Sequence, residues 1–313
     1  MPPIGIVMVT YNSKAEVGAS LDAALATGAE VVVVDNASMD GTIAEVARRG
    51  VRLIANQSNR GFAAAVNQGI LALNSPYILL LNPDAVIQSG LEELREACDL
   101  PGAGAAGGRL IGIDGRPQKG FMVRRLPTPL TLSLEALLLN RIWPNNPSNR
   151  RYRGLDLDYS VRLPVEQPAG AFLMGRRAVW QDLGGFDEGF FPLWFEDVDF
   201  CRRLVERKYL LYYVPGAVAK HTGGHSIPRI AVEMRQFYWY CSLLRYSARH
   251  FHPWSFRGVC LAVLMGSILR MLGETVFDWS LQPLVVYGKV VRLASRCLLF
   301  GWRDGVVVSG PRI

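Results

Sequence analysis

Closely spaced cysteines are missing from this sequence. Its 313 residues include five cysteines, and no two of them lie within four positions of each other. Structural zinc sites and redox motifs need cysteines at short spacing, so neither is expected. An odd number of cysteines, together with an N-terminus that shows no export-signal pattern, indicates a protein of the reducing cytoplasm.

Long apolar runs are missing as well. The longest one, residues 258–269, has twelve residues and ends at Arg270. A helix that crosses a bilayer needs about 20 apolar residues. We therefore expect no membrane-spanning segment, while contact with a membrane surface stays open.

Net charge is missing from most of the chain. Residues 1–225 hold 23 basic and 23 acidic side chains, whereas residues 226–313 hold 11 and 4, which accounts for the whole formal charge of +7. We therefore expect a globular domain over 1–225 and a basic, aromatic, helical region over 226–313. Arginines interleaved with aromatic rings suit a membrane surface, and they equally suit helices packed on the domain or a homodimer contact. The neutral domain and the lack of an RNA-binding motif argue against a nucleic-acid partner.

The first 115 residues alternate short apolar runs with helical patterns. The runs at 4–9, 31–34, 51–54 and 77–81 are each followed by a helical stretch. Such alternation with nearly all-apolar strands predicts an α/β fold with a mainly parallel sheet flanked by helices. The alternation stops over 101–170, where we expect strands and a loop that serves as a lid.

Polar side chains follow these runs, at the sheet edge where parallel α/β folds bind ligands. Asp35 could accept an N–H from a ligand base, although a turn followed by a helix cap explains the same segment. Asp84, in an Asn-Pro-Asp segment, could hold Mg²⁺ or Mn²⁺ against a diphosphate, and a plain turn is the competing interpretation. His221 could complete that metal site, although a lone histidine is more often structural; His225 lies just beyond a Gly-Gly pair.

Small residues open the helix that follows the third run. Asn59, Arg60 and Gly61 precede a phenylalanine and three alanines. This composition lets a phosphate approach a helix N-terminus, or lets the helix pack tightly on the sheet. Neither the dinucleotide nor the P-loop glycine pattern is present. Asn67 is a further candidate contact on the same helix.

The most acidic segment follows two aromatic residues at a predicted helix start. Glu196, Asp197 and Asp199 lie within four positions of one another. A carboxylate in a partly dry pocket can act as a general base, and the alternative is a solvated first turn that favours the helix dipole. Glu196 and Asp197 point about 100° apart on a helix and so would have different roles. Asp199 is expected to form an ordinary surface pair with Arg202 or Arg203.

Taken in order, seven segments resemble the family 2 glycosyltransferases, which have the GT-A fold, and most of all their bacterial rhamnosyltransferase-like branch. The resemblance covers about residues 4–225, and its carrying segments are 9–13, 34–42, 59–69, 81–85, 170–177, 184–188 and 196–199. It implies an inverting, metal-dependent enzyme that moves a sugar from a nucleoside diphosphate to a saccharide or polyprenyl-linked acceptor in cell-envelope polysaccharide synthesis.

The resemblance also implies roles for individual residues. Asp197 would be the catalytic base. Asp84, which matches the last acid of the family's metal motif, would bind Mg²⁺ or Mn²⁺ together with His221. The first position of that motif is Asn82 here, so the motif supplies one carboxylate. The predicted nucleotide-binding residues are Thr10, Tyr11, Asn12, Asp35, Asn36, Asn59, Arg60, Gly61 and Asn67. The donor and acceptor pocket would contain Asn82, Gly170, Trp194 and Glu196.

For the donor, the resemblance favours dTDP-rhamnose, with a UDP-linked galactofuranose or hexose as the alternative. A GT-A domain that binds nucleotides without catalysis is the non-enzymatic alternative. The expected location is the cytoplasm, at the inner face of the cell membrane.

Overall fold

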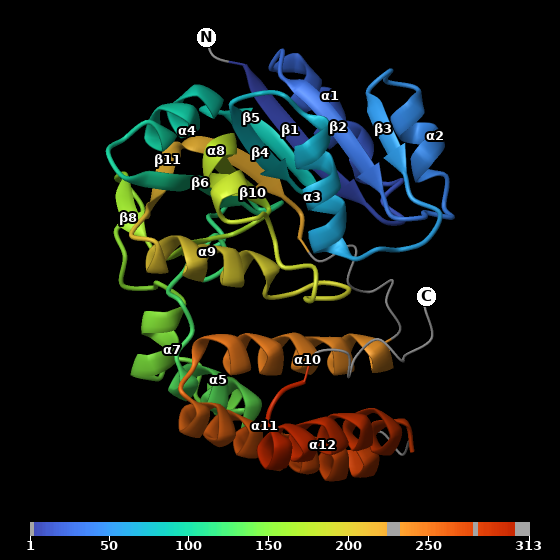
Figure 1. Cartoon of the computed structure of the whole chain (residues 1–313), viewed down its shortest axis with the longest axis vertical. Helices are drawn as coiled ribbons and strands as arrows, with labels where there is room; N and C mark the ends of the chain where they lie inside the picture. The colour runs from blue at the N-terminus through green and yellow to red at the C-terminus, as the bar shows by residue number, and fades with distance from the viewer. Residues whose placement is uncertain (1–2, 224–231, 278–280, 304–313) are drawn as a thin grey trace.

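The computed structural model describes residues 3–223, 232–277 and 281–303. A nine-stranded sheet with helices on both faces forms the upper part of the molecule in Figure 1, and three C-terminal helices form a layer below it. The strand order is β3-β2-β1-β4-β10-β6-β11-β5, with β8 paired to β11. The α/β fold with a C-terminal helical extension is therefore confirmed.

The first half of the sheet is parallel, as the apolar runs predict. Strands β2, β1 and β4 are buried almost throughout, and the helices that connect them cover both faces. The elements are β1 (Ile4–Thr10), α1 (Val17–Ala26), β2 (Glu30–Asp35), α2 (Thr42–Ala47), β3 (Arg52–Ala55), α3 (Phe62–Ala72) and β4 (Tyr77–Leu81). Their register brings Thr10 beside Asp35, so the carboxyl ends of β1 and β2 meet at one edge.

The second half of the sheet is mixed. Strand β10 runs antiparallel between β4 and β6, and β11 runs parallel to β6. The elements are β5 (Ala85–Ser89), α4 (Leu91–Cys98), β6 (Ala103–Ile111), β8 (Leu163–Val165), β10 (Phe172–Arg176), α8 (Arg177–Asp182), α9 (Glu196–Glu206) and β11 (Leu210–His221).

The Gly/Ala-rich segment 102–108 breaks the pattern of apolar runs and helical stretches, but most of it forms the buried strand β6. Small residues are required there because a Cβ on Gly107 would lie 2.4 Å from Pro168 and one on Gly108 would lie 2.4 Å from the Phe172 ring. The segment therefore lacks the β-branched residues by which a strand is usually recognised.

The prediction of a lid loop within 101–170 is wrong for the central part of that stretch, which folds into helices. The elements are the two-stranded pair β7 (Val123–Arg124) and β9 (Gln167–Pro168), with α5 (Pro129–Ala136), α6 (Leu139–Ile142) and α7 (Pro147–Tyr152). Thr128 and Asn146 cap α5 and α7 through their side chains, and each helix has a proline in its first turn. The proline- and asparagine-rich composition marks helix starts here rather than a loop.

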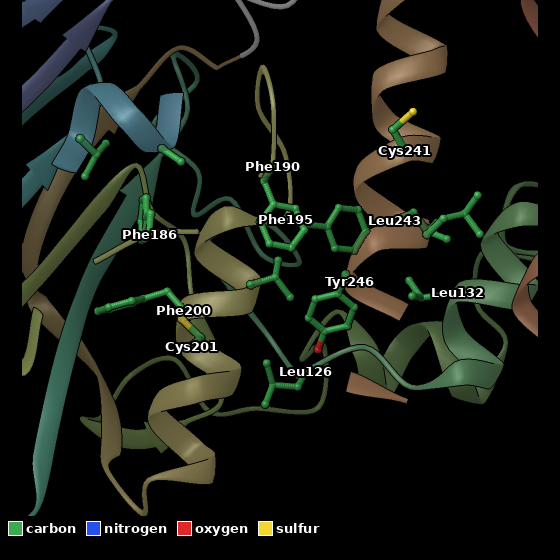
Figure 2. Close-up of a cluster of buried hydrophobic side chains, with 14 of the residues drawn as sticks. Leu126, Leu132, Phe186, Phe190, Phe195, Phe200, Cys201, Cys241, Leu243 and Tyr246 are labelled. Atoms are coloured by element: carbon green, nitrogen blue, oxygen red, sulfur yellow. The ribbon is translucent and has the colours of Figure 1, made fainter. Parts of the chain in front are cut away.

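The C-terminal helices pack against the sheet domain through a continuous apolar core. They are α10 (Val232–His250), α11 (Pro253–Phe277) and α12 (Gln282–Phe300). Figure 2 shows Phe195, at the start of α9, facing Tyr246 of α10, and their ring centroids are 5.5 Å apart. Leu132 of α5 belongs to the same cluster. The predicted boundary between 225 and 226, like His225, lies outside the described residues.

Part of the C-terminal basic charge holds α10 to the domain. Arg245 and Arg249 pair with Asp187, and the Nε2 of His250 donates to Asp199 over 2.8 Å. Asp199 also pairs with Arg203 at 2.7 Å, one of its two expected partners, but it is fully buried, so the expected surface location of the pair is wrong. Burial acts to raise the pKa of Asp199, but the His250 hydrogen bond and the Arg203 charge outweigh it and keep the pKa below its usual value.

Replacing Asp199 by alanine is expected to lower the free energy of unfolding by about 3–5 kcal/mol, because Arg203 and His250 would lose their buried partner. The matched control is Asp182→Asn, which removes an exposed pair with Arg207 and should cost under about 1 kcal/mol. Urea unfolding measures the free energy of unfolding of both variants. Equal effects of the two variants would contradict this account.

The stability that Asp199 contributes also depends on pH. Because the pKa of Asp199 in the folded state lies below the unfolded value of about 3.9, this stability is present above that pH and is lost as the pH falls further.

Helix α11 is longer than its apolar run suggests. The stretch Pro253–Val276 is long and apolar enough to cross a membrane by length and composition alone, a test that the core helix of a soluble protein also passes. Leu261, Met265, Leu269 and Leu272 are exposed along one stripe of it. One such helix is weak evidence for a membrane span, so the expectation of no membrane-spanning segment stays a prediction.

Candidate functional site

A cavity of about 790 Å³ opens at the carboxyl ends of the parallel strands and extends between the sheet domain and α10. Residues from distant parts of the chain form its wall. Ten of the predicted site residues are among them: Tyr11, Asn36, Asn59, Asn82, Asp84, Gly170, Trp194, Glu196, Asp197 and His221. The structure thus brings the predicted metal ligands and the predicted base into one space.

The remaining nucleotide-binding candidates do not line the cavity. Asp35 is fully buried, and it accepts hydrogen bonds from the hydroxyls of Thr10, at 2.7 Å, and Ser38, at 2.5 Å. Asn12 accepts from the backbone N–H of Met39 at 2.7 Å. These contacts fix the loop after β2, so Thr10, Asn12 and Asp35 shape the cavity edge rather than line it.

The start of α3 is held in a similar way. Gly61 adopts a φ of 86°, and a Cβ there would lie 2.9 Å from the Phe191 ring. Neither Gly61 nor Arg60 lines the cavity, but Gly61 accepts a hydrogen bond from Asn36, which does. Close packing thus explains this glycine.

Asn67 is turned away from the cavity. Its amide donates to the Phe186 carbonyl at 2.9 Å and accepts from the Phe186 N–H at 2.9 Å. Both ends of the side chain are therefore used to fix the segment before the acidic helix, and its predicted contact with the nucleotide has no support in this geometry.

Asp84 and His221 face each other at the cavity wall. The Oδ1 of Asp84 lies 3.5 Å from the Nε2 of His221. The Nδ1 of His221 lies 3.0 Å from the Oε1 of Gln118, an oxygen that can only accept, so Nδ1 donates and Nε2 is turned toward Asp84. Phe121 stacks on the imidazole at a centroid distance of 5.2 Å. An imidazole that is oriented through its other nitrogen and lies beside a carboxylate oxygen is a donor set that fits a divalent cation.

The ionisation of Asp84 favours cation binding. Burial acts to raise the pKa of Asp84, but the hydrogen bond and charge of His221 and the N–H of Gly223, at 3.0 Å, outweigh it and hold the pKa below its usual value. Among the described residues no group of three or more His, Cys, Asp or Glu side chains could hold a metal. A cation here would complete its shell with substrate oxygens and water, as Mg²⁺ usually does.

Asp197 lies in the first turn of α9, where its carboxylate faces the cavity. Oδ2 accepts from the N–H of Gly170 at 3.1 Å, and Oδ1 accepts from the N–H of Val198 at 2.8 Å. Burial raises the pKa of Asp197, and the two N–H groups and the charge of Arg124 limit that rise. A positioned carboxylate with a raised pKa is suited to accept a proton from a bound hydroxyl.

Glu196 also lines the cavity but differs from Asp197 in its surroundings. It is buried, and its Oε2 has no hydrogen-bond partner within the described part of the chain. Burial, followed by the neighbouring Asp197 charge, raises the pKa of Glu196 well above its usual value. Burial thus raises the pKa of both acids, and the backbone N–H groups of Gly170 and Val198 limit the rise for Asp197.

The two aromatic residues before this turn adopt unusual backbone angles. Trp194 and Phe195 have φ values of 77° and 69°, in the left-handed region that bulky residues rarely adopt. Such conformations cost about 1–3 kcal/mol each and persist where the surroundings enforce them, often at functional sites. Here they place Glu196 and Asp197 at the cavity.

No sequence pattern pointed to Gln118 or Arg124. Gln118 orients His221 from 103 positions away, and Arg124 contributes to the charge felt by Asp197. Both lie in the stretch expected to be a loop, where no pattern distinguishes them.

A family model described as "Glycosyl transferase family 2" matches residues 5–179. The chain belongs to this family. It is a glycosyltransferase, as the order of the motifs suggested. The chain is 33% identical over 242 residues to the N-acetylglucosaminyl-diphospho-decaprenol L-rhamnosyltransferase of Mycobacterium tuberculosis, which covers 72% of this chain and 77% of the relative. The succinoglycan biosynthesis protein ExoO of Rhizobium meliloti is 32% identical over 161 residues, 49% of this chain and 46% of its own.

Solved glycosyltransferases share the fold. A mannosyltransferase from Pyrobaculum calidifontis, solved with GDP-Man and Mn²⁺, matches 96% of this glycosyltransferase and 88% of its own chain, with a TM-score of 0.52 and 16% identity. At this identity the likeness establishes the architecture, including the presence of a region beyond the sheet domain.

Proposed function

We propose that this enzyme transfers L-rhamnose from dTDP-rhamnose to a saccharide carried on a polyprenyl diphosphate, with inversion at the anomeric carbon. The observation that carries the proposal is the placement of Asp84, His221 and Asp197 on the wall of one cavity. The M. tuberculosis relative supports the sugar and the acceptor class, because its name specifies both. The proposed setting is cell-envelope polysaccharide synthesis.

Asp84 and His221 would hold Mg²⁺ or Mn²⁺ in this proposal. When bound, such an ion supplies Lewis-acid stabilisation of the departing nucleoside diphosphate. The Pyrobaculum enzyme was solved with Mn²⁺ and a nucleotide sugar, which agrees with this role. The protein's own contribution is to keep Asp84 ionised and to orient His221 through Gln118.

Asp197 is the proposed general base. Its carboxylate accepts the proton of the acceptor hydroxyl as that oxygen forms a bond to the anomeric carbon, and the bond between that carbon and the donor diphosphate breaks. A single displacement of this kind inverts the configuration. The N–H groups of Gly170 and Val198 fix the direction of the carboxylate during the transfer.

A donor screen tests the proposed function. Calorimetry of the whole chain with dTDP-rhamnose, UDP-galactofuranose and UDP-hexoses is expected to show tight binding of dTDP-rhamnose in the presence of Mn²⁺ and much weaker binding in EDTA. Release of dTDP on addition of an N-acetylglucosaminyl-diphospho-lipid would complete the test. Tight binding of UDP-galactofuranose alone would replace the donor, and binding of every nucleotide without any transfer would indicate a catalytically inactive domain.

We also propose that the C-terminal helices rest on the cytoplasmic surface of the membrane. Trp254 and the stripe of Leu261, Met265 and Leu269 leave an apolar face of α11 exposed, and Arg257 lies over the Trp254 ring at 4.9 Å. Such a face suits the headgroup region of a bilayer, where a polyprenyl-linked acceptor is found. Cosedimentation with anionic vesicles, weakened by Leu261→Gln with Met265→Gln, is the expected result. A concentration-dependent dimer that fails to bind vesicles would assign the face to a second subunit instead.

A further inference from the structure

The cavity extends beyond the metal and base residues into a second half, which no motif marked. Its wall is formed by β7, α5, the end of α7, and α10. Two arginines, Arg124 and Arg153, contribute charge to this half, and Leu132, Met234 and Trp239 contribute apolar surface. Glu135 is the acid on this side, and its carboxylate accepts from Asn140 at 2.8 Å.

Arg124 and Arg153 are held next to each other by Gly120. The Nε of Arg124 donates to the Gly120 carbonyl at 2.8 Å, and a Cβ on Gly120 would lie 3.2 Å from the Cβ of Arg153. The N–H of Arg125 donates to the Tyr152 carbonyl at 2.8 Å, which fastens β7 to the end of α7. Two segments about thirty positions apart thus bring Arg124 and the exposed Arg153 to the same part of the cavity wall.

Neither guanidinium has an acidic partner in the described ranges of the chain. Arg124 lies over the rings of Phe121 and Tyr152, at 5.9 and 5.8 Å, and its terminal amino groups make no hydrogen bond there. The next residue, Arg125, differs sharply, because both of its terminal nitrogens donate to Asp156, at 2.6 and 2.8 Å. The fold therefore supplies a carboxylate for Arg125 and none for the two arginines that face the cavity.

Paired guanidinium groups without a carboxylate are suited to a group with several anionic oxygens, above all a phosphate or diphosphate. The donor diphosphate already has a proposed partner in the cation at Asp84 and His221. Arg124 and Asp197 line the same cavity, so the arginine lies in the space that the acceptor hydroxyl would enter to reach the proposed base. The apolar residues of the same half suit a prenyl chain that continues from a diphosphate.

We propose that Arg124 and Arg153 bind the diphosphate of the lipid-linked acceptor, so that the cavity holds two diphosphates, one on each side of the reacting atoms. The proposal rests on the proposed function, since it needs an acceptor with a diphosphate. It assigns the recognition of the acceptor's carrier to the protein itself, whereas the donor diphosphate is bound mainly through the cation.

A binding experiment without donor tests this site separately from transfer. Calorimetry of the whole chain in EDTA with a short-prenyl N-acetylglucosaminyl diphosphate is expected to show binding, because the arginines need no metal. Arg124→Gln and Arg153→Gln are each expected to weaken it about tenfold or more, and Arg124→Lys to weaken it less. Arg150→Gln is the matched control, because it removes an exposed charge on α7 outside the cavity wall. Thermal unfolding of each variant confirms that it is folded.

Steady-state kinetics then identify which diphosphate is bound. The two variants are expected to raise KM for the diphosphate acceptor, to leave KM for the donor unchanged, and to leave an alkyl N-acetylglucosaminide, which lacks the diphosphate, unaffected. A rise in the donor KM instead, or equal losses with both acceptors, would overturn the proposal. If the wild type binds the acceptor diphosphate through these arginines but transfers no sugar to it, the proposed function fails and the site stands. If it transfers normally and the variants behave like Arg150→Gln, the site fails and the function stands.

Discussion

Replacing Asp197 by asparagine is expected to lower kcat by about 10²–10⁴-fold while leaving donor affinity within about twofold of the wild type. The amide has nearly the same shape, but it cannot accept the proton of the acceptor hydroxyl. Its oxygen can still accept one of the hydrogen bonds from Gly170 and Val198, so the local fold should persist. Single-turnover transfer and calorimetry of donor binding measure the two quantities separately.

The pH dependence of the wild type provides an independent check of this base. Asp197 must be ionised to accept a proton, and burial raises its pKa from the usual value. Activity should therefore fall with decreasing pH, and it should begin to fall at a higher pH than for an exposed aspartate. This acid limb of kcat/KM should disappear in the asparagine variant.

Near-normal turnover of Asp197→Asn would place the base elsewhere, and the structure narrows the candidates. Asp199 is fully buried and occupied by Arg203 and His250, so it has no access to the cavity. Glu196 lines the cavity and would be the remaining acid of this segment. Glu196→Gln in the same assays distinguishes the two positions.

Removal of the metal, or of the carboxylate that would bind it, is expected to have the second large effect. EDTA should abolish transfer, and Asp84→Ala should reduce kcat/KM by at least about a hundredfold, because the negative charge of the departing diphosphate would lose its main stabilisation. Mn²⁺ titration followed by electron paramagnetic resonance measures the loss of metal affinity directly. Added Mn²⁺ should restore the EDTA-treated wild type and should not restore the variant.

Gln118→Ala is expected to weaken metal binding less than Asp84→Ala does. It removes the partner that orients His221 and leaves both ligands in place, so metal affinity should fall by about 10–100-fold instead of being lost. Higher Mn²⁺ concentrations should then recover activity. Full activity of the wild type in EDTA would show that Asp84 and His221 do not form a metal site.

The sequence predicts the parallel half of the fold well, because its strands are buried on both faces and leave uninterrupted apolar runs such as Tyr77–Leu81. Strand β6 has no such apolar run. Gly107 and Gly108 are needed there because Pro168 and Phe172, from another part of the chain, approach them closely. Likewise Pro215 and Gly216, a pair typical of a turn, lie at a register shift within the continuous strand β11.

The candidate site shows the same division between local and distant information. Asp84 and Asp197 are recognisable because each lies in a short motif at the end of an element. Gln118 and Arg153 reach the site through contacts between segments thirty to a hundred positions apart, and no local sequence pattern predicts such contacts. Asn67 shows the opposite case. Its local motif predicted a contact with the nucleotide, but its side chain bonds to Phe186 and Glu188, more than a hundred positions away.

The wall of the cavity is divided between early and late parts of the chain. In the proposed function, the strand ends that would face the donor come mostly from residues 9–84, whereas β7, α7 and α10 would face the acceptor. Changes in those later segments can thus alter which acceptor is glycosylated without disturbing the choice of sugar. An enzyme built in this way can diversify the branch points of a surface polymer while it continues to draw on a single pool of activated sugar.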